Sequence, residues 1–163
     1  MGKNRHRGNG ATAVRLPCGR FFTIDSADLP LIRGWRWFSA KRGPNFYVQG
    51  YAIGENKKRS LLHKLLTGFP QTDHINGDGL DNRRANLRRA TQSQNCLNSA
   101  KKRAHKKYKG VYFRVQTNQY WSQIYLDRKS YYCGAHKTEE DAARAYDRMA
   151  RKLHGRFARL NFP

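Results

Sequence analysis

Short apolar runs alternate with turn-forming residues over the first part of the chain, between residues 12 and 62. The runs at residues 13–16, 21–24 and 46–53 consist largely of β-branched and aromatic side chains. Glycine and proline stand between the runs, and both residue types interrupt strands and favour turns. The pattern therefore predicts a β-rich N-terminal region.

Two further features belong to this region. Trp35 and Trp37 stand two positions apart, so they would share one face of a strand, and we expect them to pack in the core. Residues 61–66 are predicted to form a short helix that is stopped by Gly68 and Pro70.

A polar segment rich in Asp, Asn and Gly follows at residues 73–82, where its composition predicts a loop. A helix is expected to begin near Asn82. Further along, residues 100–107 form a run of lysine and arginine that is typical of a linker.

The last third of the chain has a clearer pattern. Strand-like runs at residues 110–116, 120–126 and 130–134 are joined by two connections of hairpin length. Thr138 is expected to cap a helix with acidic residues in its first turn, and Gly155 can end it. The apolar residues of this helix form one stripe, which comprises Ala142, Ala145, Tyr146, Met149, Ala150 and Leu153. The segment therefore predicts a three-stranded antiparallel sheet packed on one helix.

Alternation assigns the side chains of this sheet to two faces. The face that the helix should cover carries Val111, Phe113, Val115, Ile124, Leu126, Tyr131 and Cys133. The opposite face carries Tyr112, Arg114, Trp121, Gln123, Tyr125 and Tyr132. This second composition suits contacts with DNA, because arginine and glutamine match the hydrogen-bonding groups of base edges. A second small core, packed against the first half of the chain, is the alternative.

The chain is strongly basic. Its 33 Lys and Arg residues stand against 11 Asp and Glu residues, which gives a formal net charge of +22 on 163 residues. The excess of basic residues is shared by both parts of the chain, because residues 1–100 and residues 101–163 each carry 11 more basic than acidic side chains. Basic side chains bind nucleic acid by releasing the counterions condensed on its phosphates. An anionic membrane surface is the alternative partner, but it requires a long basic amphipathic helix or a lipidation signal, and the sequence contains neither.

Composition narrows the class of protein further. With 38% hydrophobic and 12% aromatic residues, the chain has enough core-forming side chains to fold. No apolar run approaches the roughly 20 residues that span a bilayer, and the basic N-terminus lacks the apolar stretch of a signal peptide. Cys18, Cys96 and Cys133 are far apart and predict neither a disulfide framework nor a zinc site made of cysteines. We expect an intracellular protein.

The polar segment carries candidate chemistry. Asp73 and His74 stand side by side, and Asn86 and Asn95 follow 12 and 21 positions beyond His74. Phosphodiester hydrolysis needs a hard cation, for which Asp73 and Asn95 offer oxygen ligands, and a base for the attacking water, for which His74 is suited. Turn formation is the alternative role of these Asp and Asn residues. A calcium loop is excluded, because no glutamate stands at its twelfth position.

Motifs at residues 108–112, 121–124, 139–147 and 155–163 make the C-terminal segment similar to the APETALA-type (ethylene-response-factor) DNA-binding domain. The resemblance covers residues 108–163 and implies that the three-stranded sheet enters the major groove of DNA. The residues that would contact DNA by this resemblance are Lys109, Gly110, Arg114, Gln123, Tyr125, Tyr132 and Tyr146. Trp121 lies on the same face and is included in the predicted DNA-binding set. Tyr112, Gln123 and Ser130 depart from the plant domains, so the plant target sequence does not carry over.

Residues 60–98 resemble the HNH family of homing endonucleases, many of which are found in phages. The match rests on Asp-His-Ile-Asn-Gly-Asp at 73–78 and Leu-Asp-Asn-Arg-Arg-Ala-Asn-Leu-Arg at 80–88, together with residues 62–65 and 94–95. The resemblance implies that Asp73 and Asn95 bind a divalent metal, most suitably Mg²⁺, that His74 is the general base, and that Asn86 braces the loop holding His74. Asn95 replaces the usual third histidine. For His63, a phosphate contact near the site and a packing role in its helix both stay open.

These inferences predict an α+β protein, in which a β-rich N-terminal region leads into a ββα-metal HNH motif and then a three-stranded antiparallel sheet packed on one helix. An HNH motif joined to an APETALA-type domain is a known pairing. The expected divisions are a basic tail (1–11), a nuclease domain (12–99), a basic linker (100–107) and a DNA-binding domain (108–163). Phosphate contacts in the linker are expected from Lys101, Lys102 and Arg103.

The predicted function is that of a sequence-preferring, metal-dependent DNA endonuclease of the homing type, which acts on double-stranded DNA as a monomer and nicks one strand. The expected setting is a bacterial or phage-infected cell. One alternative is a non-catalytic DNA-binding regulator with a vestigial nuclease half, but the complete set of Asp73, His74, Asn86 and Asn95 argues against decay. The other is an RNA-binding protein, which explains the charge but not the Asp-His loop.

Overall fold

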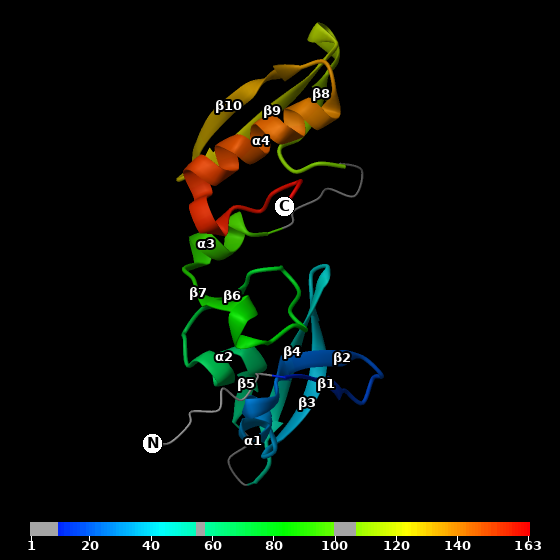
Figure 1. Ribbon diagram of the computed structural model, residues 1–163, viewed down its shortest axis with the longest axis vertical. Helices are drawn as coiled ribbons and strands as arrows, with labels where there is room; N and C mark the ends of the chain where they lie inside the picture. The colour runs from blue at the N-terminus through cyan, green and yellow to red at the C-terminus, as the bar shows by residue number, and fades with distance from the viewer. Residues whose placement is uncertain (1–9, 55–57, 100–106) are drawn as a thin grey trace, which may run out of the picture. The chain divides into compact units, whose positions relative to one another are not determined.

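The computed structural model describes residues 10–54, 58–99 and 107–163. Its contacts divide the chain into two compact units, Met1–Thr91 and Gln92–Pro163 (Figure 1). In the described parts of both units, no helix is long and apolar enough to cross a membrane. Most of the expected tail and linker lies outside the described residues, but residue 11 already belongs to the first strand and therefore not to a tail.

The N-terminal unit is rich in strands, as its alternating pattern predicts. β1 (Ala11–Arg15) and β2 (Phe21–Asp25) form an antiparallel ribbon. The 3-10 helix η1 (Ser26–Asp28) and the helix α1 (Leu29–Ile32) follow. A three-stranded antiparallel sheet comes next, composed of β3 (Trp35–Arg42), β4 (Asn45–Ala52) and β5 (Arg59–Leu61).

The second half of this unit is small and irregular. The predicted short helix is present as α2 (Leu62–Thr67) and ends at Gly68, whose φ of 68° is left-handed. β6 (Thr72–His74) then pairs with β7 (Leu87–Arg89), which follows the 3-10 helix η2 (Arg84–Asn86).

The helix expected to begin near Asn82 does not form; only the three-residue 3-10 helix η2 stands there, so that prediction is wrong. The chain there runs beside β2 instead: the Thr23 amide donates to the carbonyl of Leu80 at 2.9 Å, and the Asn82 amide donates to the carbonyl of Thr23 at 2.7 Å. Backbone groups that pair with a strand are not available to a helix. In a segment rich in Asp and Asn, helix propensity is too weak to compete with these bonds.

One hydrophobic core holds the N-terminal unit together. Its buried members are Leu16, Phe22, Ile24, Ile32, Val48, Leu62, Leu66 and Leu87. Trp37 packs against them, and its indole nitrogen donates to the carbonyl of Ile32 at 3.1 Å. Trp35 stacks on Trp37 with ring centroids 5.2 Å apart, which agrees with the prediction that both rings occupy one strand face.

The C-terminal unit begins with α3 (Gln92–Leu97) and contains the predicted sheet and helix. β8 (Val111–Arg114), β9 (Gln119–Leu126) and β10 (Lys129–His136) form an antiparallel sheet in the order β10-β9-β8. The 3-10 helix η3 (Val115–Thr117) separates β8 from β9. α4 (Glu139–His154) crosses one face of the sheet, and η4 (Gly155–Phe157) follows it (Figure 1). Thr138 caps α4 by accepting a hydrogen bond from the Asp141 amide at 3.1 Å.

The predicted covered face of this sheet is correct at its centre and wrong at one end. Val111 and Ile124 are buried beneath α4, but Phe113 and Val115 are 47% and 78% exposed. The alternation stops because β8 ends at Arg114, and Val115 starts η3. Phe113 packs instead on the ring of Tyr120, with centroids 5.1 Å apart.

Residues 92–99 group with the C-terminal unit, whereas the sequence prediction included them in the nuclease domain. Lys109 contributes to this grouping, because its ammonium donates to the carbonyls of Leu97 at 2.7 Å and Ser99 at 2.9 Å. Leu97 ends α3 and Ser99 lies two residues beyond it, so these carbonyls are at the C-terminal end of the helix, where a cation is favourable.

Candidate functional site

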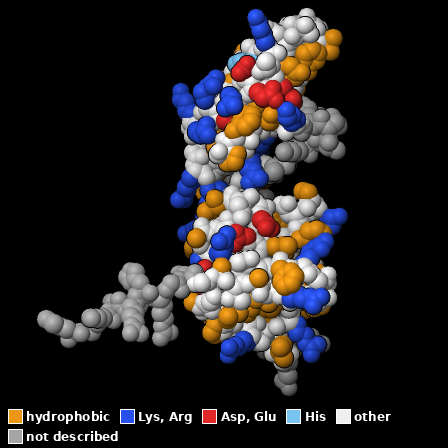
Figure 2. Space-filling view, turned by 45° about the vertical axis from the view of Figure 1, so that its right-hand side comes forward, with side chains coloured by type: hydrophobic (Ala, Val, Ile, Leu, Met, Phe, Trp, Pro, Cys, Tyr) orange, Lys and Arg blue, Asp and Glu red, His pale blue; other side chains and the backbone are white. Residues whose placement is uncertain are grey.

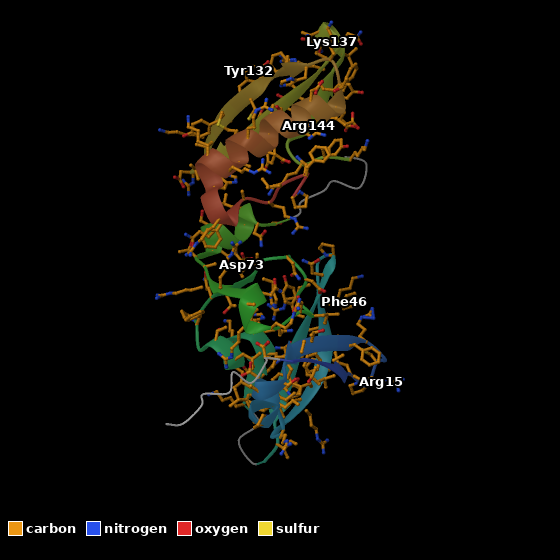
Figure 3. The ribbon with its side chains drawn as sticks, viewed as in Figure 1. Arg15, Phe46, Asp73, Tyr132, Lys137 and Arg144 are labelled. Carbon is orange, nitrogen blue, oxygen red and sulfur yellow. The ribbon has the colours of Figure 1, made fainter. Side chains whose placement is uncertain are left out.

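Asp73 and His74 are the last two residues of β6, and Figure 3 labels Asp73. Their exposed fractions are only 4% and 5%. The antiparallel pairing with β7 places Asp73 opposite Arg88 and His74 opposite Leu87. A buried acid and a buried imidazole side by side are costly unless partners satisfy them, so their contacts indicate their role.

Arg88 is an ion-pair partner of Asp73. The guanidinium Nε donates to the Asp73 Oδ2 at 2.8 Å, and a second guanidinium nitrogen donates to the same oxygen. The two side chains are 12% and 5% exposed, so little solvent screens this ion pair. A cation bound by Asp73 would share its carboxylate with Arg88.

The partner of His74 is Asn82, whose side chain is completely buried. The Asn82 amide nitrogen donates to the carbonyl of Gly79 at 3.2 Å, which turns its oxygen toward the His74 Nε2, also at 3.2 Å. The oxygen can only accept, so Nε2 carries the proton of the neutral ring and Nδ1 carries the lone pair. Burial lowers the pKa of His74, although the hydrogen bond to Asn82 and the charge of Asp73 oppose the effect. The imidazole is therefore neutral at pH 7.

Two aromatic rings enclose this imidazole. The ring of His63, on α2, lies 5.0 Å from that of His74, and the ring of Tyr47, on β4, lies 5.8 Å from it, both edge-on. Burial, followed by the charge of His74, lowers the pKa of His63 to about 3. The Nδ1 of His63 is buried and has no hydrogen-bond partner among the described residues. His63 thus contacts the candidate base directly, besides packing in its helix.

Gly79 brings the polar loop close to β4. A Cβ atom at this position would overlap the carbonyl oxygen of Phe46 and lie 2.6 Å from the ring of Tyr47. Any side chain would push the loop, and the Asn82 that follows it, away from the imidazole. Glycine is required here for close approach.

Asn86 joins parts of the same loop by hydrogen bonds. Its Oδ1 accepts from the Asn76 amide at 3.0 Å, and its Nδ2 donates to the Asn76 side-chain oxygen at 3.0 Å and to the Asp81 carbonyl at 2.7 Å. Asn76 in turn donates to the Asp81 carboxylate at 2.9 Å. These contacts lie within the loop that joins β6 to β7, so the position of Asn86 suits a bracing role.

Asn95, the other proposed metal ligand, is half-buried on α3 and belongs to the C-terminal unit. Among the described residues, no group of three or more His, Cys, Asp and Glu side chains is arranged to hold a metal. A carboxylate and an amide oxygen are nevertheless donors that Mg²⁺ prefers, and the remaining positions of such a site are ordinarily taken by water and substrate phosphate.

The uncovered face of the C-terminal sheet carries a connected set of side chains. The Arg114 guanidinium lies 4.2 Å above the ring of Trp121, and Trp121 packs on Tyr132 with centroids 4.8 Å apart. The amide of Gln123 bonds to the hydroxyls of Tyr112 and Tyr125. Tyr125 and Tyr132 remain 60% and 52% exposed; Figure 3 labels Tyr132. The face is ordered by its own contacts and open to a partner.

Other residues predicted to contact DNA pack or form hydrogen bonds within the C-terminal unit. Tyr146 is 2% exposed, so it has almost no surface for DNA. Gly110, at φ 74°, makes room for it, because a Cβ there would overlap the Tyr146 ring. The ammonium of Lys109 is bonded within the unit, as described above. Lys101, Lys102 and Arg103 lie outside the described residues.

Sequence reasoning gave no role to Asn82, Arg88 or Tyr47. Asn82 stands inside the quoted motif, but only its burial identifies it as the partner of His74. The opposition of Arg88 and Asp73 follows from the register of β6 and β7, which a correct hairpin prediction would have given. In the sequence, Tyr47 is one of several aromatic residues in a predicted strand, and no local feature indicates that it contacts His74.

Comparison with known proteins adds one relative. No protein-family model matches the chain. The chain is 29% identical over 148 residues to an uncharacterized HNH endonuclease of Acanthamoeba polyphaga mimivirus, and the match covers 88% of this chain and 75% of the relative. This similarity supports an HNH-type nuclease. It extends over both units, but it does not test the APETALA-type resemblance, which stays a prediction.

Proposed function

We propose that this chain is a metal-dependent DNA endonuclease of the HNH type that nicks one strand of a duplex near a preferred sequence, in the manner of homing enzymes. The observation that carries the proposal is the buried, neutral His74, which Asn82 holds in one tautomer and which follows the buried Asp73 in β6. The similarity to the viral HNH endonuclease and the net charge of +22 support it.

His74 is the general base in this proposal. Its lone pair on Nδ1 accepts a proton from the attacking water, and Asn82 accepts the hydrogen bond from Nε2–H before and after this transfer. Because burial keeps the imidazole neutral, the base is in its reactive form at physiological pH. Tyr47 and His63 restrict the ring to one orientation. General-base catalysis of this kind contributes about 10²–10⁴ in rate.

Asp73 and Asn95 would hold the divalent metal. When bound, the metal stabilises the negative charge on the leaving oxygen of the phosphodiester. Arg88 neutralises Asp73 in the described structure, so metal binding and the Asp73–Arg88 ion pair are coupled.

The uncovered sheet face of the C-terminal unit is the proposed recognition surface. Arg114 and Gln123 offer bidentate groups to base edges, and Trp121, Tyr125 and Tyr132 offer apolar contacts. Gln123 is oriented by two tyrosine hydroxyls, so its amide is preorganised. Lys101, Lys102 and Arg103 are proposed to contact phosphates.

Nicking of one strand is expected because each chain has one proposed catalytic centre. The chain contains one Asp-His pair in this setting, and the two strands of a duplex run antiparallel. One centre therefore attacks one phosphate per docking event, and cutting the second strand needs a second protein molecule or a reoriented complex.

The test is a time course on supercoiled plasmid with Mg²⁺, with EDTA, and with His74→Ala in place of the wild type. Open circles should accumulate before linear DNA, only with the wild type and Mg²⁺. Binding without nicking would favour a non-catalytic DNA-binding regulator instead. Linear DNA formed at once, at a rate rising with the square of protein concentration, would contradict single-strand nicking. Sequencing the ends cut from a genomic library then identifies the preferred site.

A further inference from the structure

The sheet β3–β4–β5 has one face toward the core of the N-terminal unit and one face away from it. Trp37 and Val48 point to the core side, and both contact its hydrophobic cluster. Gly50 lies opposite Trp37, and a Cβ there would be 2.5 Å from the indole ring. The core side of this sheet is therefore packed around Trp37 and Val48. On the other face, Arg36, Arg42, Tyr51 and Arg59 are exposed, whereas Gln49 is buried.

The strand registers define the residues of this other face. They are Arg36, Phe38, Ala40, Arg42, Asn45, Tyr47, Gln49, Tyr51, Arg59 and Leu61. Three of them are arginines and none is acidic, and Arg36, Arg42 and Arg59 are all exposed. Within the described residues, none of these arginines forms an ion pair with Asp or Glu. We refer to Arg36, Phe38, Arg42, Tyr51 and Arg59 as the arginine–aromatic face.

The face is preorganised by its own contacts. Phe38 stacks on Tyr51 with centroids 5.4 Å apart, and the Arg59 guanidinium lies 5.6 Å from the Tyr51 ring centroid. Arg59 also donates to the side-chain oxygen of Gln49 at 2.9 Å. Tyr51 keeps 40% of its surface exposed despite these contacts. An arginine held by an aromatic ring and an amide loses little conformational entropy when it binds a partner.

This face is continuous with the candidate catalytic centre. By register, Tyr47 lies on the same side of the sheet as this face, and its ring is in edge contact with the rings of both His63 and His74. The charge of Arg42 also acts on His63, because it is among the influences, after burial and the charges of His74 and Lys64, that lower the pKa of His63. The positive face therefore leads along β3 and β4 to the imidazole.

We propose that the arginine–aromatic face is a second DNA-contact surface, which binds backbone phosphates next to the scissile bond and guides the duplex to His74. The inference rests on the proposed function, which gives duplex DNA as the substrate. Phosphate is the partner that charge complementarity selects, since a second copy of this face would bring three arginines against three others with no acidic residue between them. Basic side chains are prominent on the surface seen in Figure 2. The arginine–aromatic face includes residues of β4, the strand whose Tyr47 ring contacts the imidazole of His74.

The first experiment measures binding of the full chain to a duplex of about 40 base pairs, in EDTA so that cutting is not required, over a range of salt concentrations. Arg36→Ala with Arg59→Ala should weaken binding several-fold and reduce the salt slope by about 0.9 for each phosphate that is no longer neutralised. Tyr51→Ala should weaken binding but keep the slope, because it removes no charge. Arg15→Ala is the matched control: Arg15 is an exposed arginine on β1, outside this sheet, and its replacement should leave the slope unchanged (Figure 3).

The second experiment uses the unaltered chain, so it does not depend on how a variant folds. Arginines are modified with phenylglyoxal, with and without the duplex, and located by mass spectrometry. DNA should protect Arg36, Arg42 and Arg59, and it should leave Arg15 reactive.

Equal reactivity of these arginines with and without DNA, together with an unchanged salt slope in the double variant, overturns the inference. Protection by anionic lipid vesicles in place of DNA overturns it as well. If the face is dispensable while the plasmid is still nicked, the inference fails and the proposed nuclease stands. If DNA protects the face but Mg²⁺ never produces nicks, the nuclease proposal fails and the binding surface stands.

Discussion

The Nε2 of His74 lies 3.2 Å from the side-chain oxygen of Asn82, and the amide nitrogen of Asn82 is bonded to the carbonyl of Gly79. The second bond fixes which end of the amide faces the imidazole. Asn82 therefore determines the tautomer of His74 as well as its orientation, although it does not reach the substrate in the proposed mechanism. It is a positioning residue.

Replacing Asn82 tests this relationship. Asn82→Ala should slow the single-turnover rate of nicking by about tenfold to hundredfold while the DNA affinity stays near the wild-type value. The missing hydrogen bonds and the small cavity should also destabilise the fold by about 1–3 kcal/mol. Asn98→Ala removes another buried asparagine, from the C-terminal unit, and should lower stability without slowing the chemical step. A normal nicking rate in Asn82→Ala would assign Asn82 to folding alone.

Replacing His74 or Asp73 should abolish catalysis while leaving DNA binding intact. His74→Ala and Asp73→Ala should each abolish nicking, because the base and the metal ligand act on the transition state, whereas docking relies on other residues. Binding curves measured in parallel should overlay that of the wild type, and excess Mg²⁺ should not restore Asp73→Ala. Wild-type rates in both variants would show that the centre lies elsewhere.

The ion pair between Asp73 and Arg88 gives a prediction on metal binding that does not need activity. Arg88→Met leaves a buried carboxylate without its cation, which should cost about 3–5 kcal/mol of stability in the absence of metal. Mg²⁺ can replace the missing positive charge, so it should raise the Tm of Arg88→Met more than that of the wild type. Thermal unfolding with and without Mg²⁺ measures this difference. Asp73→Asn with Arg88→Met should lose the response, and an equal Mg²⁺ effect on all forms would remove Asp73 from the metal site.

The buried imidazoles predict how stability depends on pH. Burial lowers the pKa of His63 to about 3 and also lowers that of His74, from an ordinary value of 6.5. Each ring takes up a proton on unfolding once the pH falls below 6.5, so stability is complete above that value and decreases below it. The loss should reach at most about 1.4 kcal/mol per pH unit for each ring. Urea unfolding at pH 7.5, 6 and 5 measures it.

His63→Gln provides the comparison for that measurement. It removes one of the rings with a lowered pKa, a group that also includes His154, and should make the decline between pH 6.5 and 5 shallower than in the wild type. An identical decline would mean that His63 does not resist protonation in the folded chain.

Recognition should depend on Arg114. Arg114→Ala should reduce affinity for the preferred site by about 1–3 kcal/mol and relax the preference at one base position. The ring of Trp121 beneath it supports the guanidinium, so Arg114→Lys should recover charge but not specificity. Binding to a library of sites with single substitutions measures both effects. An equal loss at every site would make Arg114 a phosphate contact.

Local pattern alone determined most of the secondary structure. The β-rich first half, the short helix ending at Gly68, and the sheet followed by α4 all follow from side-chain periodicity and from capping residues, which act within a few positions along the chain. The sequence also named Asp73, His74, Asn86 and Asn95 through a family resemblance. Their chemical roles stay predictions until the variants are measured.

The tertiary structure decided what surrounds those residues. Arg88, Asn82 and Tyr47 reach Asp73 and His74 from positions 15, 8 and 27 residues away, and nothing local to each of them indicates where it will lie. The stretch near Asn82 shows why: its backbone pairs with β2, so a long-range contact stands where a helix was predicted to begin. Periodicity predicts which side of an element is apolar, but only the packing of the whole unit selects the polar partners of a buried charge, because their bonds join segments that are distant in the sequence.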